Sequence, residues 1–263
     1  MPRFLPRLTG VGVIELHGIL GATIRSSVYY QILDRVERSS AIGCVILDID
    51  SSGGSAAASE DLYMKVSRLA KKKPVVAFIR GTGASGAYLV ACGASRIVAM
   101  PSAIVGSLGV ISMRPVVADL LERLGISVSV SKSGPLKDMG AFYRQPTPEE
   151  ESKAQSLVSE IYQSLLERVA EARHMSIEQL QPYATGEVYT ARRGKEIGLV
   201  DELGDFDAAL DISMSLGQVP RRVVYLRPPR SMRMRLMGRL ASWALEGVIQ
   251  ETGVVTADSL WYL

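Results

Sequence analysis

The sequence VVAFIRGTGASGAYLVAC, residues 75–92, contains an apolar run, a glycine-rich loop and a segment of small residues in immediate succession. The run Val75 to Ile79 is typical of a buried strand, and Ser85 to Cys92 of a closely packed helix. Ser85 therefore lies where the strand passes into the helix. Backbone N–H groups at a helix N-terminus favour developing negative charge, so this junction suits a nucleophile.

The same order of strand, loop and helix recurs on both sides of this stretch. CVILDID (residues 44–50) predicts a second buried strand, and SSGGS (residues 51–55) a loop that precedes a helix. Further strands are predicted at residues 12–16, 96–100, 127–131 and 223–226, and helices at residues 26–38, 56–69 and 149–173. Repeated units of this kind imply crossover connections, and hence an α/β fold with a mostly parallel sheet and helices on both faces.

The composition excludes several kinds of protein and of site. The chain has 263 residues, of which 47% are hydrophobic, so it is not disordered and can bury a sizeable core. Two cysteines and two histidines make a disulfide framework, a Cys-rich zinc site and a His-based metal cluster improbable. We expect no metal and no cofactor. The two histidines also leave little material for a Ser-His-Asp triad, so in a hydrolase another group would move the proton.

The loop GTGASG, Gly81 to Gly86, matches the G-x-G-x-x-G pattern of dinucleotide-binding proteins. That function needs an acidic residue about 20 positions further on, which holds the ribose. No Asp or Glu occurs between Asp61 and Asp119, and no GK[ST] follows a glycine loop. The pattern therefore does not indicate a nucleotide site.

The loops at residues 51–55 and 81–86 both lead from a strand end to a helix start. In a parallel sheet both would emerge at the same carboxyl edge. The N–H groups of Gly54 and Gly86 are therefore candidates for an oxyanion hole beside Ser85. The alternative interpretation is that both loops are only tight turns before helices.

Several motifs in the right order resemble the signal peptide peptidase A family of Ser-Lys serine peptidases, whose fold is related to the Clp protease and crotonase enzymes. The resemblance covers about residues 10 to 212. It rests on four stretches: LDIDSSGG (47–54), GTGASGAYLVACGASRIVAMPSAIVGS (81–107), SKSGPLKDMGAFYRQPTPEE (131–150) and TGEVYTARRGKEIGLVDELG (185–204). The chain is similar to the half-length type of this family, which has a single peptidase domain. We place this domain at residues 1–226.

The resemblance implies that Ser85 is the nucleophile, Lys137 the general base and Ser107 a residue that orients the lysine. It also implies that Gly54 and Gly86 are the oxyanion donors. A lysine in an apolar site can lose its proton, because burial disfavours the ammonium form. Lys132 is the competing candidate for the base. Asp138 would favour a charged lysine, so we expect that side chain to point away from the site.

Two residues depart from the family pattern. Ser52 stands where the family usually has proline, which we expect to loosen the loop slightly. Ala87 replaces a glycine, and its methyl group is expected to lie near the substrate path and to narrow specificity.

We therefore expect an ATP-independent endopeptidase that cuts hydrophobic peptides such as remnant signal peptides. The resemblance also implies that the chain assembles into a homo-oligomeric ring. Candidate residues for an apolar substrate groove are Leu89, Val105, Leu108, Val110 and Ile111, each of which also fits a core position. The alternatives are a crotonase-type enzyme, which the lack of acids from Gly81 to Val117 disfavours, and a catalytically idle scaffold or membrane-surface binder.

The segment 227–263 forms a basic, amphipathic C-terminal tail. No acidic residue occurs from Ile212 to Leu245, whereas this stretch contains Arg221, Arg222, Arg227, Arg230, Arg233, Arg235 and Arg239. The tail is interpreted as a helix on a membrane surface, with a solvated tail or a subunit contact as alternatives. We expect no nucleic-acid partner. No transmembrane helix is predicted, and the expected localisation is membrane-associated or cytoplasmic in a bacterial or archaeal cell.

Overall fold

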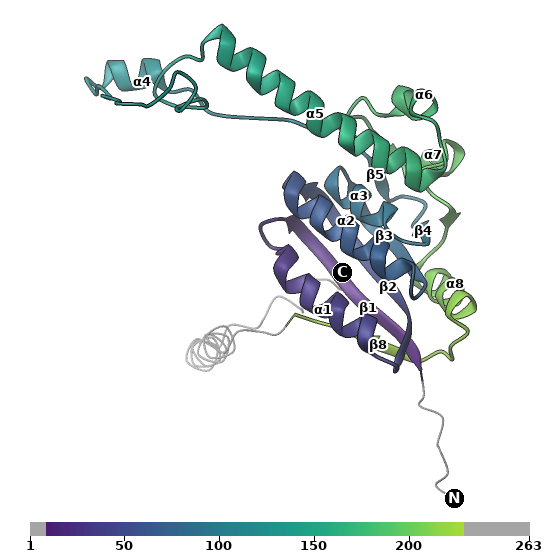
Figure 1. The fold of residues 1–263 in the computed structure, drawn as a ribbon. Coiled ribbons are helices and arrows are strands. Elements are labelled where there is room, and N and C mark those ends of the chain that lie inside the picture. The colour runs from purple at the N-terminus through teal and green to yellow at the C-terminus, as the bar shows by residue number, and fades with distance from the viewer. Residues whose placement is uncertain (1–8, 229–263) are drawn as a thin grey trace, which may run out of the picture. The chain divides into compact units, whose positions relative to one another are not determined.

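A single sheet of eight strands is the centre of the computed structural model, which describes residues 9–228 (Figure 1). The strands are β1 (Gly10–Leu20), β2 (Ile42–Gly54), β3 (Val75–Ala84), β4 (Arg96–Ala99), β5 (Ile104–Gly106), β6 (Val188–Thr190), β7 (Glu202–Leu203) and β8 (Val223–Tyr225). Their order is β6-β5-β3-β2-β1-β8, and β4 and β7 extend the sheet from the first half of β3. The pairs are parallel except for β5 with β6. The predicted α/β fold is confirmed.

Alternating residues of the strands build two cores, one on each face of the sheet. On β1, Ile14 and Leu16 belong to the larger core and Val11 and Val13 to the smaller one. The larger core is covered by helices α1 (Ser26–Arg38), α2 (Ala56–Ala70), α3 (Gly86–Cys92) and α5 (Pro148–Arg173), and the smaller one by α8 (Phe206–Gly217). The remaining helices are α4 (Ala118–Arg123), α6 (Ile177–Leu180), the 3₁₀ turn η1 (Gln181–Tyr183) and α7 (Ala191–Glu196). Both faces are therefore buried, as apolar runs without polar alternation predict.

One predicted strand is wrong. Residues 127–131 alternate serine and valine, but they form no regular element and pair with no strand of the described chain. They belong to the segment 111–147 between β5 and α5, which we call the arm. Its exposed apolar side chains are Ile111, Met113, Leu120, Leu124, Ile126, Val128, Val130 and Phe142. A strand pattern without a neighbouring strand leaves its backbone unpaired, which explains the missing element.

Helix α5 connects the arm to the rest of the fold (Figure 1). Its start is specified by Thr147, whose side chain accepts a hydrogen bond from the Glu150 N–H, while the Glu150 carboxylate accepts one from the Thr147 N–H. Pro148 occupies the first turn, where its missing N–H costs nothing. These signals fix the point where the arm ends.

No helix within residues 9–228 is long and apolar enough to cross a membrane. The run from Ile97 to Met113 forms β4, a turn and β5 before it enters the arm. The amphipathic helix predicted for the tail falls on residues beyond 228, outside the described part of the chain.

Candidate active site

Ser85 occupies a backbone conformation that a non-glycine residue rarely adopts, with φ 53° and ψ −126°. Strand β3 ends at Ala84 and α3 begins at Gly86, so the chain turns sharply at this one residue. The turn is held by the Ser85 N–H, which donates to the Gly106 carbonyl at 2.8 Å, and its side chain makes no capping hydrogen bond. Strain of this kind costs about 1–3 kcal/mol and is concentrated at functional sites.

The glycine loop at the end of β2 packs directly against this turn. Gly53 has φ +98°, and a Cβ there would lie 2.9 Å from both the Ala84 carbonyl oxygen and the Gly86 nitrogen. The Gly53 N–H donates to Ser51 Oγ at 3.1 Å and is thus used within the loop. Gly54, with φ +146°, is the next residue and lines the same cavity as Ser85 and Gly86.

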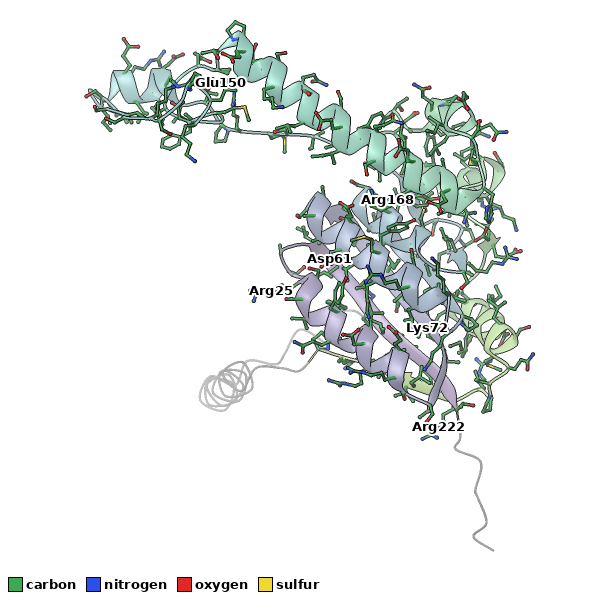
Figure 2. All side chains as sticks on the ribbon, viewed as in Figure 1. Arg25, Asp61, Lys72, Glu150, Arg168 and Arg222 are labelled. Carbon is green, nitrogen blue, oxygen red and sulfur yellow. The ribbon has the colours of Figure 1, made fainter. Side chains whose placement is uncertain are left out.

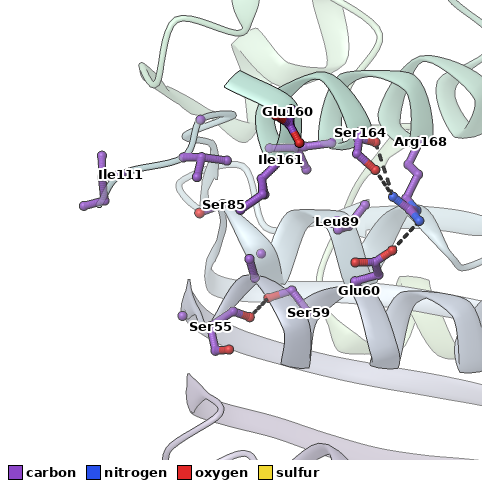
Figure 3. A pocket seen from close by; sticks show the side chains of 16 residues that line it. Ser55, Ser59, Glu60, Ser85, Leu89, Ile111, Glu160, Ile161, Ser164 and Arg168 are labelled. Atoms are coloured by element: carbon purple, nitrogen blue, oxygen red, sulfur yellow. Dashed lines mark hydrogen bonds and ion pairs between the residues drawn. The ribbon is translucent and has the colours of Figure 1, made fainter. Parts of the chain in front are cut away.

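A cavity of about 450 Å³ opens beside Ser85, within the usual range for ligand sites (Figure 3). Four segments line it: the start of α2, the start of α3, residues 109–111 and the middle of α5. Its apolar wall is formed by Leu89, Val110, Ile111, Ile161 and Leu165. The cavity is therefore an apolar recess with a serine at its edge.

Of the five residues proposed for the groove, Leu89, Val110 and Ile111 line this cavity. Val105 and Leu108 do not line it; both are completely buried in the larger core. A fully covered side chain cannot contact a peptide, so these two are packing residues. Ala87 is only 2% exposed and also belongs to the core, which contradicts the expected narrowing of the substrate path.

The α5 side of the cavity was not predicted. Ile161, Ser164, Leu165 and Arg168 are spaced three or four residues apart, so they share one face of the helix. This periodicity is visible in the sequence, but it does not say which element the face contacts. Ser59 and Glu60 of α2 were missed for the same reason.

Gly86 has no room for a side chain. A Cβ at this position would overlap Ser59 Oγ and lie 2.8 Å from Ser59 Cβ. Ser59 is 1% exposed, and its hydroxyl donates to the Ser55 carbonyl at 2.8 Å. The start of α3 thus packs closely against α2 at Ser59.

Gly86→Ala is therefore expected to lower the free energy of unfolding by about 1–3 kcal/mol, because the new methyl group overpacks the contact with α2. Thermal and urea unfolding measure this loss. The matched test adds Ser59→Gly, which removes both clashing atoms, and the two substitutions should show a favourable coupling energy. Independent, additive losses in the double variant would contradict the described contact.

The structure brings Ser85, Gly54 and Gly86 together at the cavity, which neither Ser107 nor Lys137 lines. Ser107 follows Gly106, which pairs with Ala84 and accepts the Ser85 N–H. Lys137 is exposed on the arm and does not line the cavity. The side-chain network around the neighbouring residue Asp138 reaches Glu150 at the start of α5, about 15 Å along the helix from the cavity-lining Glu160.

Asp138 is the centre of an ionic network in the arm. Its carboxylate accepts hydrogen bonds from Arg144 Nε at 3.0 Å, Lys132 Nζ at 2.6 Å and the Tyr143 hydroxyl at 3.0 Å. The Arg144 guanidinium and, next, the Lys132 ammonium hold the pKa of Asp138 well below its usual range. Lys132 is therefore engaged by Asp138. Arg144 in turn binds Glu150, a buried residue in the first turn of α5 (Figure 2).

The attachment of the arm to α5 is expected to depend on pH. Arg144 and the Thr147 N–H lower the pKa of Glu150 from its ordinary value of 4.5 to about 2. A lowered folded-state pKa contributes stability that is complete above pH 4.5 and is lost as the pH falls through 2. Amide hydrogen exchange in residues 132–147 should therefore accelerate between about pH 5 and about pH 2.5, after correction for intrinsic rates.

The control variant is Glu150→Gln, which keeps an acceptor for the Thr147 N–H but removes the charge. It should exchange faster at about pH 5 and show a smaller further acceleration at about pH 2.5, which comes from Asp138, whose pKa is also lowered. The same acceleration on acidification in the wild type and the variant would refute the role of Glu150.

Residues 9–228 contain no group of three His, Cys, Asp or Glu side chains placed to hold a metal ion. Both cysteines are free and buried, and burial raises the pKa of Cys44 to about 11 and of Cys92 to about 12. These thiols are protonated at neutral pH. Ser85 is therefore the candidate nucleophile that this geometry supports.

The model of peptidase family S49 matches residues 67–219, which include the Ser85 turn, the arm and α5. The chain belongs to peptidase family S49. Among its relatives, a putative protease of Methanocaldococcus jannaschii is 42% identical over 69% of this chain and 58% of its own length. The chloroplastic serine protease SPPA of Arabidopsis thaliana is 30% identical over 80% of this chain and 32% of its own length.

Structural neighbours of this S49 chain share its fold. A point mutant of the 1510-N membrane-bound stomatin-specific protease has a TM-score of 0.54 at 17% identity, covering 84% of this chain and 99% of that one. A point mutant of ClpP1 from Listeria monocytogenes has a TM-score of 0.52 at 16% identity, covering 75% of this chain and 94% of that one. The Clp protease-like fold implied by the resemblance is confirmed.

Proposed function

We propose that this S49 chain is a serine endopeptidase in which Ser85 attacks peptide bonds within apolar segments, without the use of ATP. The observation that carries the proposal is the position of Ser85. It sits in a strained turn at the N-terminus of α3 and opens onto an apolar cavity. Membership of a peptidase family and the likeness of the sequence to signal peptide peptidases support the same activity.

In the proposed reaction, Ser85 Oγ attacks the carbonyl carbon of the scissile peptide bond and its proton passes to a neutral amine. The N–H groups of Gly54 and Gly86 bind the oxyanion of the tetrahedral intermediate. The base then protonates the leaving amine, and the C–N bond breaks to leave an ester on Ser85. Water hydrolyses the ester by the same sequence of steps and restores the serine.

We assign the base to Lys137 and infer that a second copy of the chain supplies it. Lys137 is exposed on an arm that also exposes eight large apolar side chains. Apolar area of this extent is unusual on the surface of a monomer and marks an interaction surface. Docking of the arm on a neighbouring copy would cover this surface and bring Lys137 to that copy's Ser85.

Repetition of this contact from copy to copy generates a closed ring when the rotation between copies closes. The chain shares the fold of ClpP1, and this likeness supports the proposal of an oligomer. Analytical ultracentrifugation at the concentration where peptide is cleaved tests this part of the proposal. The sedimentation coefficient of a monomer would contradict it.

A serine-directed fluorophosphonate tests the proposed nucleophile. We expect one covalent adduct per site, located on Ser85 by mass spectrometry, and its formation should run parallel to the loss of peptidase activity. A chain that cleaves apolar peptides without labelling at Ser85 would contradict the proposal. A chain that neither cleaves nor labels would instead be an idle scaffold of the same fold.

We further propose that the arginine-rich segment 227–263 binds anionic membrane surfaces, because its basic and apolar residues are interleaved. Co-sedimentation with vesicles containing anionic lipid, compared between the full chain and one that ends at residue 226, tests this assignment. Equal binding by both chains would refute it.

A further inference from the structure

The cavity beside Ser85 has a polar end as well as an apolar wall. Figure 3 shows Arg168 and Glu60 on the far side of Leu89 from Ser85. Arg168 lies about 10 Å along α5 from Ile161, which belongs to the apolar wall. A substrate side chain that extended from Ser85 past Leu89 would therefore approach the Arg168 guanidinium.

Arg168 is held in place by neighbours from two helices. Its Nη2 forms an ion pair with Glu60 of α2, and its Nη1 donates to the Ser164 hydroxyl on its own helix. The guanidinium also lies over the ring of Tyr63, 6.0 Å from its centre. Figure 2 shows Arg168 extending from α5 toward α2. The side chains of Arg168 and Glu60 remain 26% and 44% exposed, so the pair borders the cavity and is not sealed in the core.

The charges at this end of the cavity cancel each other. Glu60 contributes one negative charge and Arg168 one positive charge. Glu160 is the remaining charged residue that lines the cavity; it is exposed and accepts a hydrogen bond from the Ser156 hydroxyl at 3.0 Å. A charged substrate side chain that reached the pair would find a partner there only by displacing one of its two members.

We propose that the Glu60–Arg168 pair sets the charge selectivity of this pocket, so that it accepts uncharged apolar side chains and rejects both cationic and anionic ones. The inference rests on the proposed peptidase function and assigns the substrate class of the same site. An apolar side chain gains contact with Leu89, Ile161 and Leu165 and leaves the pair intact. The mutual neutralisation of Glu60 and Arg168 thus keeps this end of the pocket without net charge.

Two substitutions should change this selectivity in opposite directions. Arg168→Gln leaves the Glu60 carboxylate without its cation, so the kcat/KM of substrates with lysine in the pocket should rise relative to leucine substrates. Glu60→Gln leaves the Arg168 guanidinium without its anion, so the kcat/KM of substrates with glutamate in the pocket should rise relative to leucine substrates. The ratio compares kcat/KM for the charged substrate with kcat/KM for the leucine substrate. We expect each single variant to change this ratio by about tenfold or more. The double variant carries no charge at either position and should keep the wild-type order.

The experiment uses the full chain and three fluorogenic peptides that differ only in the residue before the scissile bond: leucine, lysine or glutamate. Glu167→Gln is the matched control, because Glu167 is the exposed neighbour of Arg168 and pairs with Gln163. The control should keep the wild-type ratios. Thermal unfolding of every variant measures the loss of the contact between α2 and α5.

Opposite shifts in the two single variants, with the wild-type order in the double variant, would support the proposal. An equal loss on all three peptides, or unchanged ratios, would overturn it, because a purely structural clamp affects every substrate alike. Ser85→Ala separates this result from the peptidase proposal. Cleavage that survives Ser85→Ala contradicts the proposed function, whereas cleavage that depends on Ser85 with unchanged ratios contradicts only the selectivity.

Discussion

Ser85→Ala is expected to reduce kcat for apolar peptides by roughly 10⁴–10⁶ and to leave the fold intact. The hydroxyl makes no capping hydrogen bond to α3, so its removal breaks no helix contact. Alanine is accommodated where serine already adopts φ 53°. Peptide hydrolysis under saturating substrate, together with thermal unfolding of the same preparation, measures both parts of the prediction.

The matched control is Ser55→Ala, which removes a second hydroxyl that lines the same cavity. Ser55 is the N-cap of α2 and accepts a hydrogen bond from the Ala58 N–H, so its loss should cost about 1 kcal/mol of stability. We expect this variant to be less stable and to remain active within about tenfold, because the hydroxyl takes no part in the chemistry. The opposite pattern, an active Ser85→Ala and an inactive, stable Ser55→Ala, would place the nucleophile at Ser55.

Lys137→Ala is expected to lower kcat/KM by roughly 10²–10⁴, the usual contribution of a general base. Lys132→Ala is the comparison, because the Lys132 ammonium already binds Asp138 in the arm. That variant should lose less than about tenfold, through a looser arm and not through loss of the proton acceptor. Full activity of Lys137→Ala would exclude it as the base, and a larger loss in Lys132→Ala would transfer the role to Lys132.

The sheet and the Ser85 turn were predictable because local chemistry specifies them. Apolar runs such as Val75 to Ile79 form strands buried on both faces, and glycines stand around Ser85 where the close approach of the two loops leaves no room for side chains. The cap formed by Thr147 and Glu150 likewise marks the start of α5 in the sequence itself. Such features depend on residues close together in the chain.

The arm and the pocket depend on contacts between distant residues, and sequence patterns do not contain these. Alternating valines predicted a strand at residues 127–131, although the described chain offers no strand to pair with it. Val105 and Leu108 lie near the proposed nucleophile region in sequence, but the fold buries both. Conversely, Arg168 reaches Glu60 from 108 positions away. Which apolar residue faces a cavity is decided by packing between elements.

The separation of Ser85 from Lys137 leads to the most direct test. Ser85→Ala and Lys137→Ala chains are each expected to be inactive alone; they are dissociated and reassembled together at equal concentration. A site between two copies is complete only where an intact Ser85 meets an intact Lys137, so about one quarter of the sites should recover activity. Recovery to that level is the result we predict. Mixed oligomers, verified by tags on both chains, that stay inactive would contradict a site built from Ser85 and Lys137 of neighbouring copies.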